Sequence, residues 1–101
     1  MQAMTLEFRL RPESELDLEN AVFWYEAQSV GLGQQFLDET VAILSVIAEA
    51  PLVYPIVHRN TRRALMRRFP FGVYYRIDSS LVLVVAIMHG SRNPQRWKGR
   101  D

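Results

Sequence analysis

The sequence predicts an α+β domain whose elements follow one another in the order β-α-α-β-β-β. Three observations lead to this prediction: an alternating apolar segment opens the chain, two helical stretches follow, and three strand-like segments fill the second half. We therefore expect a helix hairpin packed on one face of a mostly antiparallel four-stranded sheet. The 101 residues fit one domain, residues 1–101, and leave little room for a second core.

The first strand and the first helix adjoin near the start of the chain. Residues Met4 to Leu10 alternate between apolar and polar side chains, which predicts a half-buried strand. Pro12 suits the first turn of a helix. The acidic residues that follow occupy the end of the helix where its dipole favours negative charge: Glu13, Glu15, Asp17 and Glu19. The helix should run to about Gln28, because Gly31 and Gly33 interrupt the pattern.

A second helix is predicted from about Gln34 to Glu49. Its apolar residues recur at three- and four-residue spacing, and Pro51 ends it. The connection between the two helices is short, so an antiparallel helix hairpin is expected. The segment from Leu52 to Thr61 is interpreted as a loop.

Strand patterns dominate the second half. The predicted strands are Arg62–Phe69, Val73–Ile77 and Leu81–Met88. Turns are expected at Pro70 and Gly72 and again at residues 78–80. The last strand is apolar on both faces, which is typical of a central strand. Alternation in the other two places several arginines on the sheet face away from the helices, and a polar tail from His89 to Asp101 closes the chain.

The composition excludes several classes of protein. There is no cysteine, so disulfides, thiolate metal sites and cysteine nucleophiles are excluded. No glycine-rich phosphate loop, paired-histidine motif or zinc-ligand spacing occurs, and we expect neither a metal nor a cofactor. The longest apolar run is far shorter than the roughly 20 residues of a membrane span, and the N-terminus lacks the apolar core of a signal peptide. We expect a cytoplasmic protein with no membrane partner.

Charge is divided between the two halves of the chain. Residues 1–50 contain two basic and nine acidic side chains, whereas residues 51–101 contain ten basic and two acidic ones. Eleven of the twelve basic residues are arginine, whose planar guanidinium suits phosphates and carboxylates. This asymmetry predicts a polyanionic or acidic partner for the second half. The alternative is that the two halves neutralise each other within the fold.

The basic residues of the second half are interleaved with aromatic ones. The basic members are Arg59, Arg62, Arg63, Arg67, Arg68, Arg76, His89, Arg92, Arg96, Lys98 and Arg100, and the aromatic members are Tyr74, Tyr75 and Trp97. Arginine beside an aromatic ring can hold a phosphate backbone while stacking a base. The same residues could bind an acidic peptide or protect a sheet edge from aggregation.

Two residues near the end of the chain have a structural and a functional interpretation each. His89 could transfer protons, because its ordinary pKa is near neutrality, or it could cap the last strand, which we favour. Trp97 could contact a partner, but we favour its role as an anchor that holds the tail on the domain.

Five segments together resemble the RelE/ParE toxin superfamily. They are Ala21–Glu26, Gly31–Gly33 leading to Phe36, Pro51 with Tyr54-Pro55, Phe69–Arg76, and Val84–His89 with Arg92, Pro94, Trp97 and Arg100. The segments cover nearly the whole chain, in order and at consistent spacing. The last strand and the Trp-Tyr-Glu helix look closer to the ParE-like side, and β-α-α-β-β-β is the fold of that superfamily.

The resemblance implies the toxin of a type II toxin–antitoxin system, held inactive by a cognate antitoxin in a toxin–antitoxin hetero-oligomer. ParE-like members poison DNA gyrase, which is the leading hypothesis. RelE-like members cleave messenger RNA on the ribosome without a metal; this first alternative would use Arg63, Arg67, Arg76 and His89. A second alternative is a non-toxic relative that binds only its partner. The lysines that the RelE-like pattern has on the first strand of the second half are absent, and so is a tyrosine in the tail. Their absence favours binding over cleavage. The residues expected to bind the partner or target are Arg62, Arg68, Tyr74, Arg92, Arg96, Trp97 and Arg100.

Overall fold

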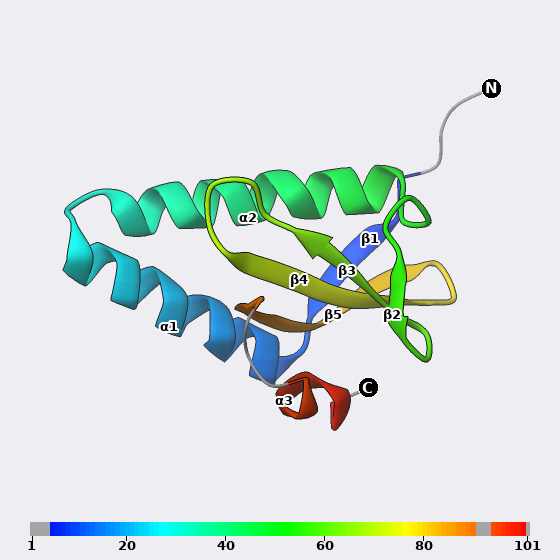
Figure 1. Ribbon diagram of the computed structural model, residues 1–101. Coiled ribbons are helices and arrows are strands. Elements are labelled where there is room, and N and C mark those ends of the chain that lie inside the picture. The colour runs from blue at the N-terminus through cyan, green and yellow to red at the C-terminus, as the bar shows by residue number, and fades with distance from the viewer. Residues whose placement is uncertain (1–4, 91–93, 101) are drawn as a thin grey trace.

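The computed structural model describes residues 5–90 and 94–100. Its helices and strands, in chain order (Figure 1), are β1 (Glu7–Leu10), α1 (Pro12–Gln28), α2 (Leu32–Glu49), β2 (Ile56–His58), β3 (Thr61–Leu65), β4 (Phe71–Asp78), β5 (Leu81–His89) and α3 (Gln95–Lys98). The α+β class and the predicted order are confirmed, with the strand β2 and the short helix α3 as additions.

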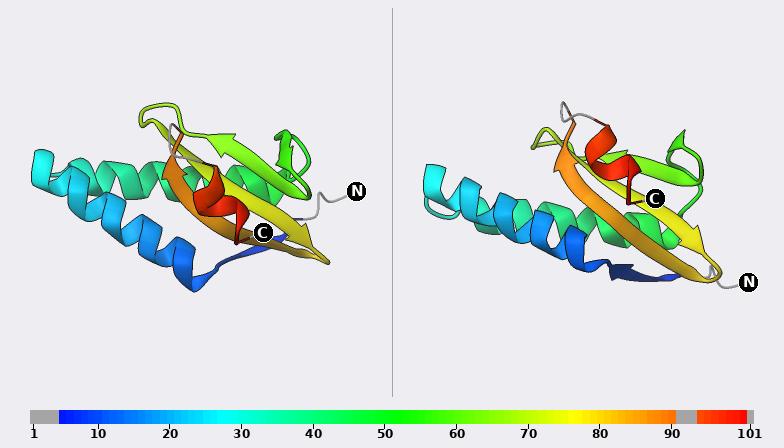
Figure 2. Two further views of the ribbon diagram at one scale, coloured as in Figure 1. Left: turned by 60° about the horizontal axis from the view of Figure 1, so that its bottom comes forward. Right: turned by 90° about the horizontal axis from the view of Figure 1, so that it is seen from below.

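The five strands form one sheet in the order β1-β5-β4-β3-β2. β1 is parallel to β5 and the other neighbours are antiparallel, so the mostly antiparallel sheet is confirmed. The expected count of four strands is wrong, because β2 lies in the segment interpreted as a loop; it is a strand only through its pairing with β3. Helices α1 and α2 cover one face of the sheet, and α3 lies against the other (Figure 2).

The turn between α1 and α2 is held by hydrogen bonds from its backbone N–H groups to one side chain of α1. The Glu26 carboxylate accepts hydrogen bonds from the N–H groups of Gly31, at 2.9 Å, and Gly33, at 3.0 Å. A Cβ atom at Gly33 would lie 2.7 Å from the carbonyl oxygen of Val22, so glycine permits this close crossing of the helices. Gly31 takes a left-handed φ of 89°, and α2 begins directly after it, slightly earlier than predicted.

Phe36 lies at the centre of the core between the helices and the sheet. It is fully buried, and its ring centroid lies 5.2, 5.1 and 4.9 Å from those of Tyr25, Phe69 and Phe71. Distances and ring angles of this kind are typical of favourable aromatic pairs. The cluster joins α1, α2 and the start of β4 into one apolar unit.

A β-bulge in β5 distributes its apolar residues between the two faces of the sheet. Tyr75 lies opposite Val84, but Tyr74 lies opposite Ala86, so Val85 is an extra residue. Val84 therefore joins the core under the helices while Ala86 joins a second cluster on the other face. The prediction that this strand is internal and apolar on both faces is confirmed.

Helix α1 covers the edge of β5 that β1 leaves unpaired. The Ser14 hydroxyl donates a hydrogen bond to the Val84 carbonyl at 3.0 Å, and the Asp17 carboxylate accepts one from the Ile87 N–H at 3.1 Å. The Arg100 guanidinium donates to the same carboxylate at 2.6 Å. The side chains of this ion pair are only 14% and 21% exposed, so α1, the sheet and the C-terminal segment meet at a shielded charge pair.

Strand β3 is shorter than predicted. It ends at Leu65, and residues 66–70 form a turn closed by a hydrogen bond from the Met66 N–H to the carbonyl of the first β4 residue. Phe69 turns into the aromatic core and is 7% exposed. The expectation that Arg67 and Arg68 lie on a strand is wrong, because burial of Phe69 takes this segment out of the sheet.

Candidate functional site

The face of the sheet away from α1 and α2, here called the open face, carries the basic residues that remain on strands. Tyr74 belongs to the apolar cluster on this face, and side chains of a strand alternate. Arg76, two residues further along β4, therefore lies on the open face. Arg63 also lies there, because it is directly opposite Tyr74 in the pairing of β3 with β4.

Helix α3 covers part of the open face. Trp97 is 4% exposed, and its ring stacks on that of Tyr74 with centroids 4.5 Å apart and an interplanar angle of 27°. The His58 ring contacts Trp97 in a T-shaped arrangement, with centroids 5.8 Å apart. The favoured interpretation of Trp97 as an anchor of the tail agrees with this packing, and both views in Figure 2 place α3 against the sheet.

Gly72 gives the Arg63 side chain its place on the open face. A Cβ atom at Gly72 would lie 3.3 Å from Cγ and 3.4 Å from Cδ of Arg63. The aliphatic stem of Arg63 therefore lies over the neighbouring strand, and a Cβ atom at Gly72 would require it to shift slightly. Such a stem can pack on the sheet while its guanidinium stays in water.

Arg76 borders a shallow polar hollow at the far end of β4. The hollow has a volume of about 330 Å³, and its lining residues are Arg59, Asn60, Arg76, Ile77 and Asp78. Two guanidinium groups and one carboxylate give it a net positive charge. Arg59 lies in the tight turn between β2 and β3, with a left-handed φ of 49°. Sequence reasoning did not assign Arg59 to the site, because this turn was interpreted as part of a long loop.

Three of the arginines expected to bind a partner are instead used within the fold. Arg62 donates hydrogen bonds to the carbonyls of Tyr54, at 2.6 Å, and Leu52, at 3.2 Å. Arg68 donates to Gln35 of α2 at 2.6 Å, and Arg100 forms the ion pair with the Asp17 carboxylate described above. These bonds are all made on the helix side or at the edge of the sheet.

The other residues expected to bind a partner differ in exposure. Tyr74 and Trp97 are 3% and 4% exposed, so α3 would have to move before a partner could contact their ring faces. Arg96 is exposed on α3, whereas Arg92 lies outside the described residues.

The four residues proposed for RNA cleavage do not meet at one point. His89 lies opposite Phe71, with the ring centroids 5.6 Å apart. Arg76 is five residues further along β4, so the strand rise separates the two backbones by roughly 17 Å. Arg76 and His89 also lie on opposite faces of the sheet, because Phe71 faces the helices. Arg67 is in the turn after β3, and Arg63 alone shares the open face with Arg76.

The described part of the chain offers no arrangement of histidine and carboxylate side chains that could hold a metal ion. Within residues 5–90 and 94–100, no helix combines the length and the apolar character that a membrane span requires.

Comparison with known proteins gives a family and two related folds. A profile of the family described as ParE toxin of type II toxin–antitoxin system, parDE, matches residues 8–94. The chromosomal ParDE TA system from P. aeruginosa contains a chain with a TM-score of 0.70 and 14% identity, over 87% of this chain and 98% of that one. The toxin–antitoxin complex RelBE2 from Mycobacterium tuberculosis contains a chain with a TM-score of 0.62 and 19% identity, over 87% of this chain and 94% of that one. At these identities the structures show the fold alone, and no curated protein is significantly similar in sequence.

Proposed function

The chain belongs to the ParE toxin family of type II toxin–antitoxin systems, and on that premise we propose that it inhibits growth by binding DNA gyrase through the open face of its sheet. The contact would centre on Arg63 and Arg76, with Arg59 and Arg96 beside them. A cognate antitoxin would hold the protein inactive in a hetero-oligomer. With these two partners it would act in the cytoplasm.

The observation that carries this proposal is the separation of Arg76 from His89. A metal-independent nuclease needs its basic groups and proton-transfer groups around one phosphate and one ribose hydroxyl, within hydrogen-bond reach of them. Here Arg76 and His89 lie on opposite faces of the sheet, and His89 of β5 is paired with the first residue of β4, far from Arg76. Separated guanidinium groups on a broad sheet suit an extended binding surface better than a catalytic centre.

Supercoiling of relaxed plasmid by purified gyrase tests the proposal. The purified chain should inhibit supercoiling, and the double substitution R63A/R76A should remove at least about 90% of that inhibition, since both groups act at the contact. Its thermal unfolding should stay close to that of the wild type, because partly exposed arginines contribute little to stability.

The matched control is R67A/R68A, which removes the same charge from the turn after β3. This variant should inhibit gyrase as the wild type does, although Arg67 belongs to the set proposed for RNA cleavage. Inhibition that survives R63A/R76A would place the contact elsewhere. Codon-positioned cleavage on programmed ribosomes, without any effect on gyrase, would support the endoribonuclease instead. Normal growth when the protein is produced without its antitoxin would favour the second alternative, a non-toxic relative that binds only its partner.

A further inference from the structure

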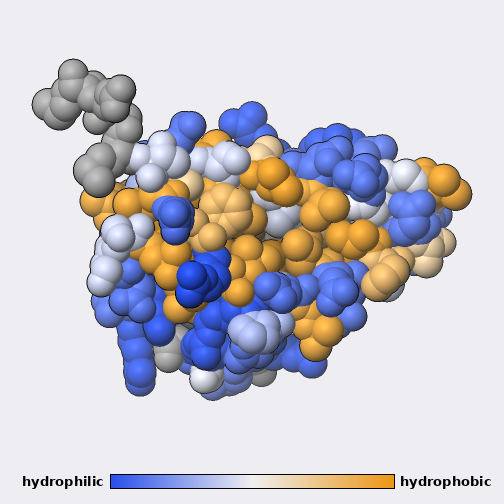
Figure 3. Space-filling model, turned by 180° about the vertical axis from the view of Figure 1, so that it is seen from behind, coloured by the Kyte–Doolittle hydropathy of each residue, from blue (hydrophilic) through white to orange (hydrophobic). Residues whose placement is uncertain are grey.

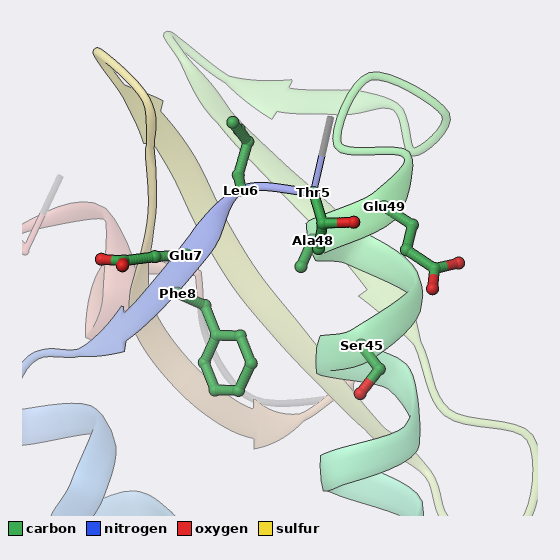
Figure 4. Close-up of a pocket in the computed structure, with 7 residues that line it drawn as sticks. All are labelled: Thr5, Leu6, Glu7, Phe8, Ser45, Ala48 and Glu49. Carbon is green, nitrogen blue, oxygen red and sulfur yellow. The ribbon is translucent and has the colours of Figure 1, made fainter. Parts of the chain in front are cut away.

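Exposed apolar residues gather on two sides of α2, and the two sides differ in charge. One group lies between the helices and β1 (Figure 3), where a hollow of about 420 Å³ is lined by Phe8 and Ala48 together with the acidic residues Glu7 and Glu49 (Figure 4). The other group lies beside β2, where residues 50–58 include no aspartate, glutamate, lysine or arginine. Sheets commonly protect a free edge with charged side chains, so this uncharged edge indicates a contact.

Four exposed apolar side chains, here called the β2 patch, belong to this second group. They are Val46 of α2, Leu52 and Val53 of the loop before β2, and Ile56 of β2 itself, with exposed fractions of 47%, 68%, 71% and 55%. Arg62 of β3 holds the loop through the carbonyls of Leu52 and Tyr54, while the apolar side chains of the loop stay in solvent. Grouped apolar residues of this kind mark an interaction surface.

The hydrogen bonds of Arg68 identify the side of α2 on which Val46 lies. Arg68 is in the turn between β3 and β4, and it donates to Glu39 through its backbone N–H and to Gln35 through its guanidinium. Val46 follows Glu39 by seven residues, or two helical turns, and therefore lies on the same stripe of the helix. This stripe faces the side of the molecule where β3 and β2 lie.

The backbone of Ile56 points to the free edge of the sheet. β2 is the last strand in the sheet order, and among the described residues it pairs with β3 alone. The Arg63 N–H donates to the Pro55 carbonyl at 3.1 Å. In an antiparallel ladder the next residue directs its N–H and C=O the other way, so those of Ile56 point outward. Ile56 is opposite Arg62, two residues before Ala64 of the helix-side core, so its side chain lies on the helix side.

The two ends of β2 limit which strand can pair with it. Pro55 has no N–H to donate, and Arg59 turns the chain away from the edge with a left-handed φ of 49°. A partner strand therefore meets one outward N–H and C=O, those of Ile56. A second copy of β2, running antiparallel about a two-fold axis, matches this edge. The Ile56 N–H of each copy can then donate to the Ile56 carbonyl of the other.

The charges near β2 permit such a pairing. Arg59 lies three residues from Ile56, so the Arg59 Cα atoms of the two copies would be roughly 20 Å apart along the strands. This separation exceeds the Debye length of about 8 Å at physiological salt. Arg62 lies closer to the axis, but its guanidinium already donates to the loop of its own chain. A highly charged partner strand, by contrast, would find no counter-charge on β2.

We propose that the chain forms a two-fold dimer in which the β2 strands of two copies pair antiparallel and join the two sheets into one. The axis is perpendicular to the sheet, so the helices of both copies lie on the same side and the two β2 patches meet there. Two backbone hydrogen bonds at Ile56 and the apolar side chains hold the contact. The open face of each copy stays accessible, and the inference does not depend on the gyrase proposal.

Sedimentation equilibrium of the full chain tests the dimer. The wild type should associate with a Kd on the order of 10 µM, because the contact is small. I56K places two ammonium groups beside the axis and should raise the Kd at least about tenfold. The matched control is L65K, at a side chain of nearly equal exposure, 54% against 55%, that shares the open face with Arg63. L65K should change the Kd by less than about twofold.

Val46 and Val41 supply a second matched pair, on α2. Their exposed fractions are 47% and 51%. Val41 lies one turn before Ser45, which lines the hollow beside β1, so it is on the other side of the helix from Val46. V46K should raise the Kd by about threefold or more, whereas V41K should leave it unchanged.

A cysteine variant tests the pairing without introducing charge. The chain contains no cysteine, so I56C carries a single thiol. Directly opposite residues of a hydrogen-bonded antiparallel pair have Cα atoms about 5.5 Å apart, which is within the range that a disulfide spans. Mild oxidation should therefore convert most of I56C into a covalent dimer, and L65C should remain mainly monomeric.

A wild-type chain that stays monomeric about a hundredfold above the expected Kd would overturn the inference. Equal effects of I56K and L65K, or equal cross-linking of I56C and L65C, would place any dimer contact elsewhere and overturn it too. If I56K fails to fold, the I56C cross-link remains the deciding measurement. R63A/R76A should dimerise as the wild type does, so failure of the gyrase proposal and failure of the dimer are seen in different assays.

Discussion

The helix side and the open face enclose the same core but differ in charge and in the way their apolar residues are covered. The helix side carries most of the acidic residues and leaves several apolar side chains exposed, among them Val41 at 51%. The open face is basic, and its own apolar cluster is covered by α3 through Trp97. The division of charge along the chain has thus become a division across the sheet.

Part of the charge is nevertheless neutralised inside the fold. Arg100 pairs with Asp17, whereas the Arg68 guanidinium donates to the neutral amide of Gln35. Arg59 and Arg63 form no ion pair with the described residues. Arg100 thus helps to hold the two layers together, whereas Arg59 and Arg63 are available to a partner. The ion pair agrees with neutralisation within the fold, whereas a polyanionic or acidic partner for the open face stays a prediction.

The largest expected effect comes from the core that both regions share. Replacing Phe36 by alanine removes a fully buried ring from the cluster between the helices and the sheet. The free energy of unfolding should fall by about 4 kcal/mol, measured by urea denaturation. The control is F23A, a ring on the same hairpin that is 71% exposed, for which a change below about 0.5 kcal/mol is expected. Similar losses for both would mean that Phe36 does not join the two layers.

The next effect concerns the ion pair that links the helix side to the sheet. Asp17→Ala leaves the Ile87 N–H without its acceptor and Arg100 without its counter-charge in a shielded position. The free energy of unfolding should fall by about 3 kcal/mol. Glu19→Ala removes an exposed carboxylate from the same helix and should have little effect. If the two substitutions cost the same, α1 is not anchored to the edge of β5 in this way.

A smaller effect is expected where the tail covers the open face. Trp97→Ala removes the ring that stacks on Tyr74, and α3 should detach without unfolding the sheet. The free energy of unfolding should fall by about 1 to 2 kcal/mol, less than for a core tryptophan, because the tail detaches and leaves no enclosed cavity. Hydrogen exchange should become faster in α3 and leave α2 unchanged. Trp24→Ala, at a ring that is 58% exposed on α1, serves as the control.

The smallest effect appears at alkaline pH. Tyr75 is fully buried and donates a hydrogen bond to the Pro51 carbonyl at 2.6 Å. Burial raises its pKa from 10.0 to about 12, although the nearby Arg62 guanidinium opposes the increase. Below pH 10 the phenol is protonated in both the folded and the unfolded chain. Between pH 10 and about 12 only the folded chain keeps the proton, so its stabilising contribution is lost as the pH rises through this window.

Chemical denaturation at a series of pH values measures this contribution. Tyr75→Phe should lower stability at neutral pH by about 1 kcal/mol, through loss of the hydrogen bond, and should flatten the decline between pH 10 and 12. Tyr54→Phe, which leaves Tyr75 in place, should keep the decline. An unchanged alkaline decline in Tyr75→Phe would assign it to other groups.

Local pattern alone was enough to predict α1, α2, β4 and β5. The bounds of α1, Pro12 to Gln28, match the prediction, because Pro12 favours the first turn and the glycines end the helix locally. The alternation of β4 and the apolar run of β5 also persist through their whole length. Each of these signals resides in neighbouring residues, so it can be read without knowing what lies across the fold.

The remaining elements depend on contacts between distant parts of the chain. β2 has three residues and exists through its pairing with β3. β3 ends early because Phe69 is drawn into an aromatic cluster with Tyr25 and Phe36. The segment interpreted as a polar tail contains α3, whose position depends on Trp97 reaching Tyr74 across the sheet.

By itself, the sequence determined the α+β class, the helix hairpin, the strands β4 and β5, and the division of charge, since all of these follow from neighbouring residues. Tertiary structure alone decided where each arginine lies and what it contacts. Arg62 donates to carbonyl groups of the preceding loop, and Arg100 pairs with a carboxylate 83 residues away, whereas Arg63 and Arg76 lie on the open face. The physical reason is that a guanidinium group binds whichever acceptor the fold brings within reach. The distance between the two groups in the folded chain cannot be read from composition.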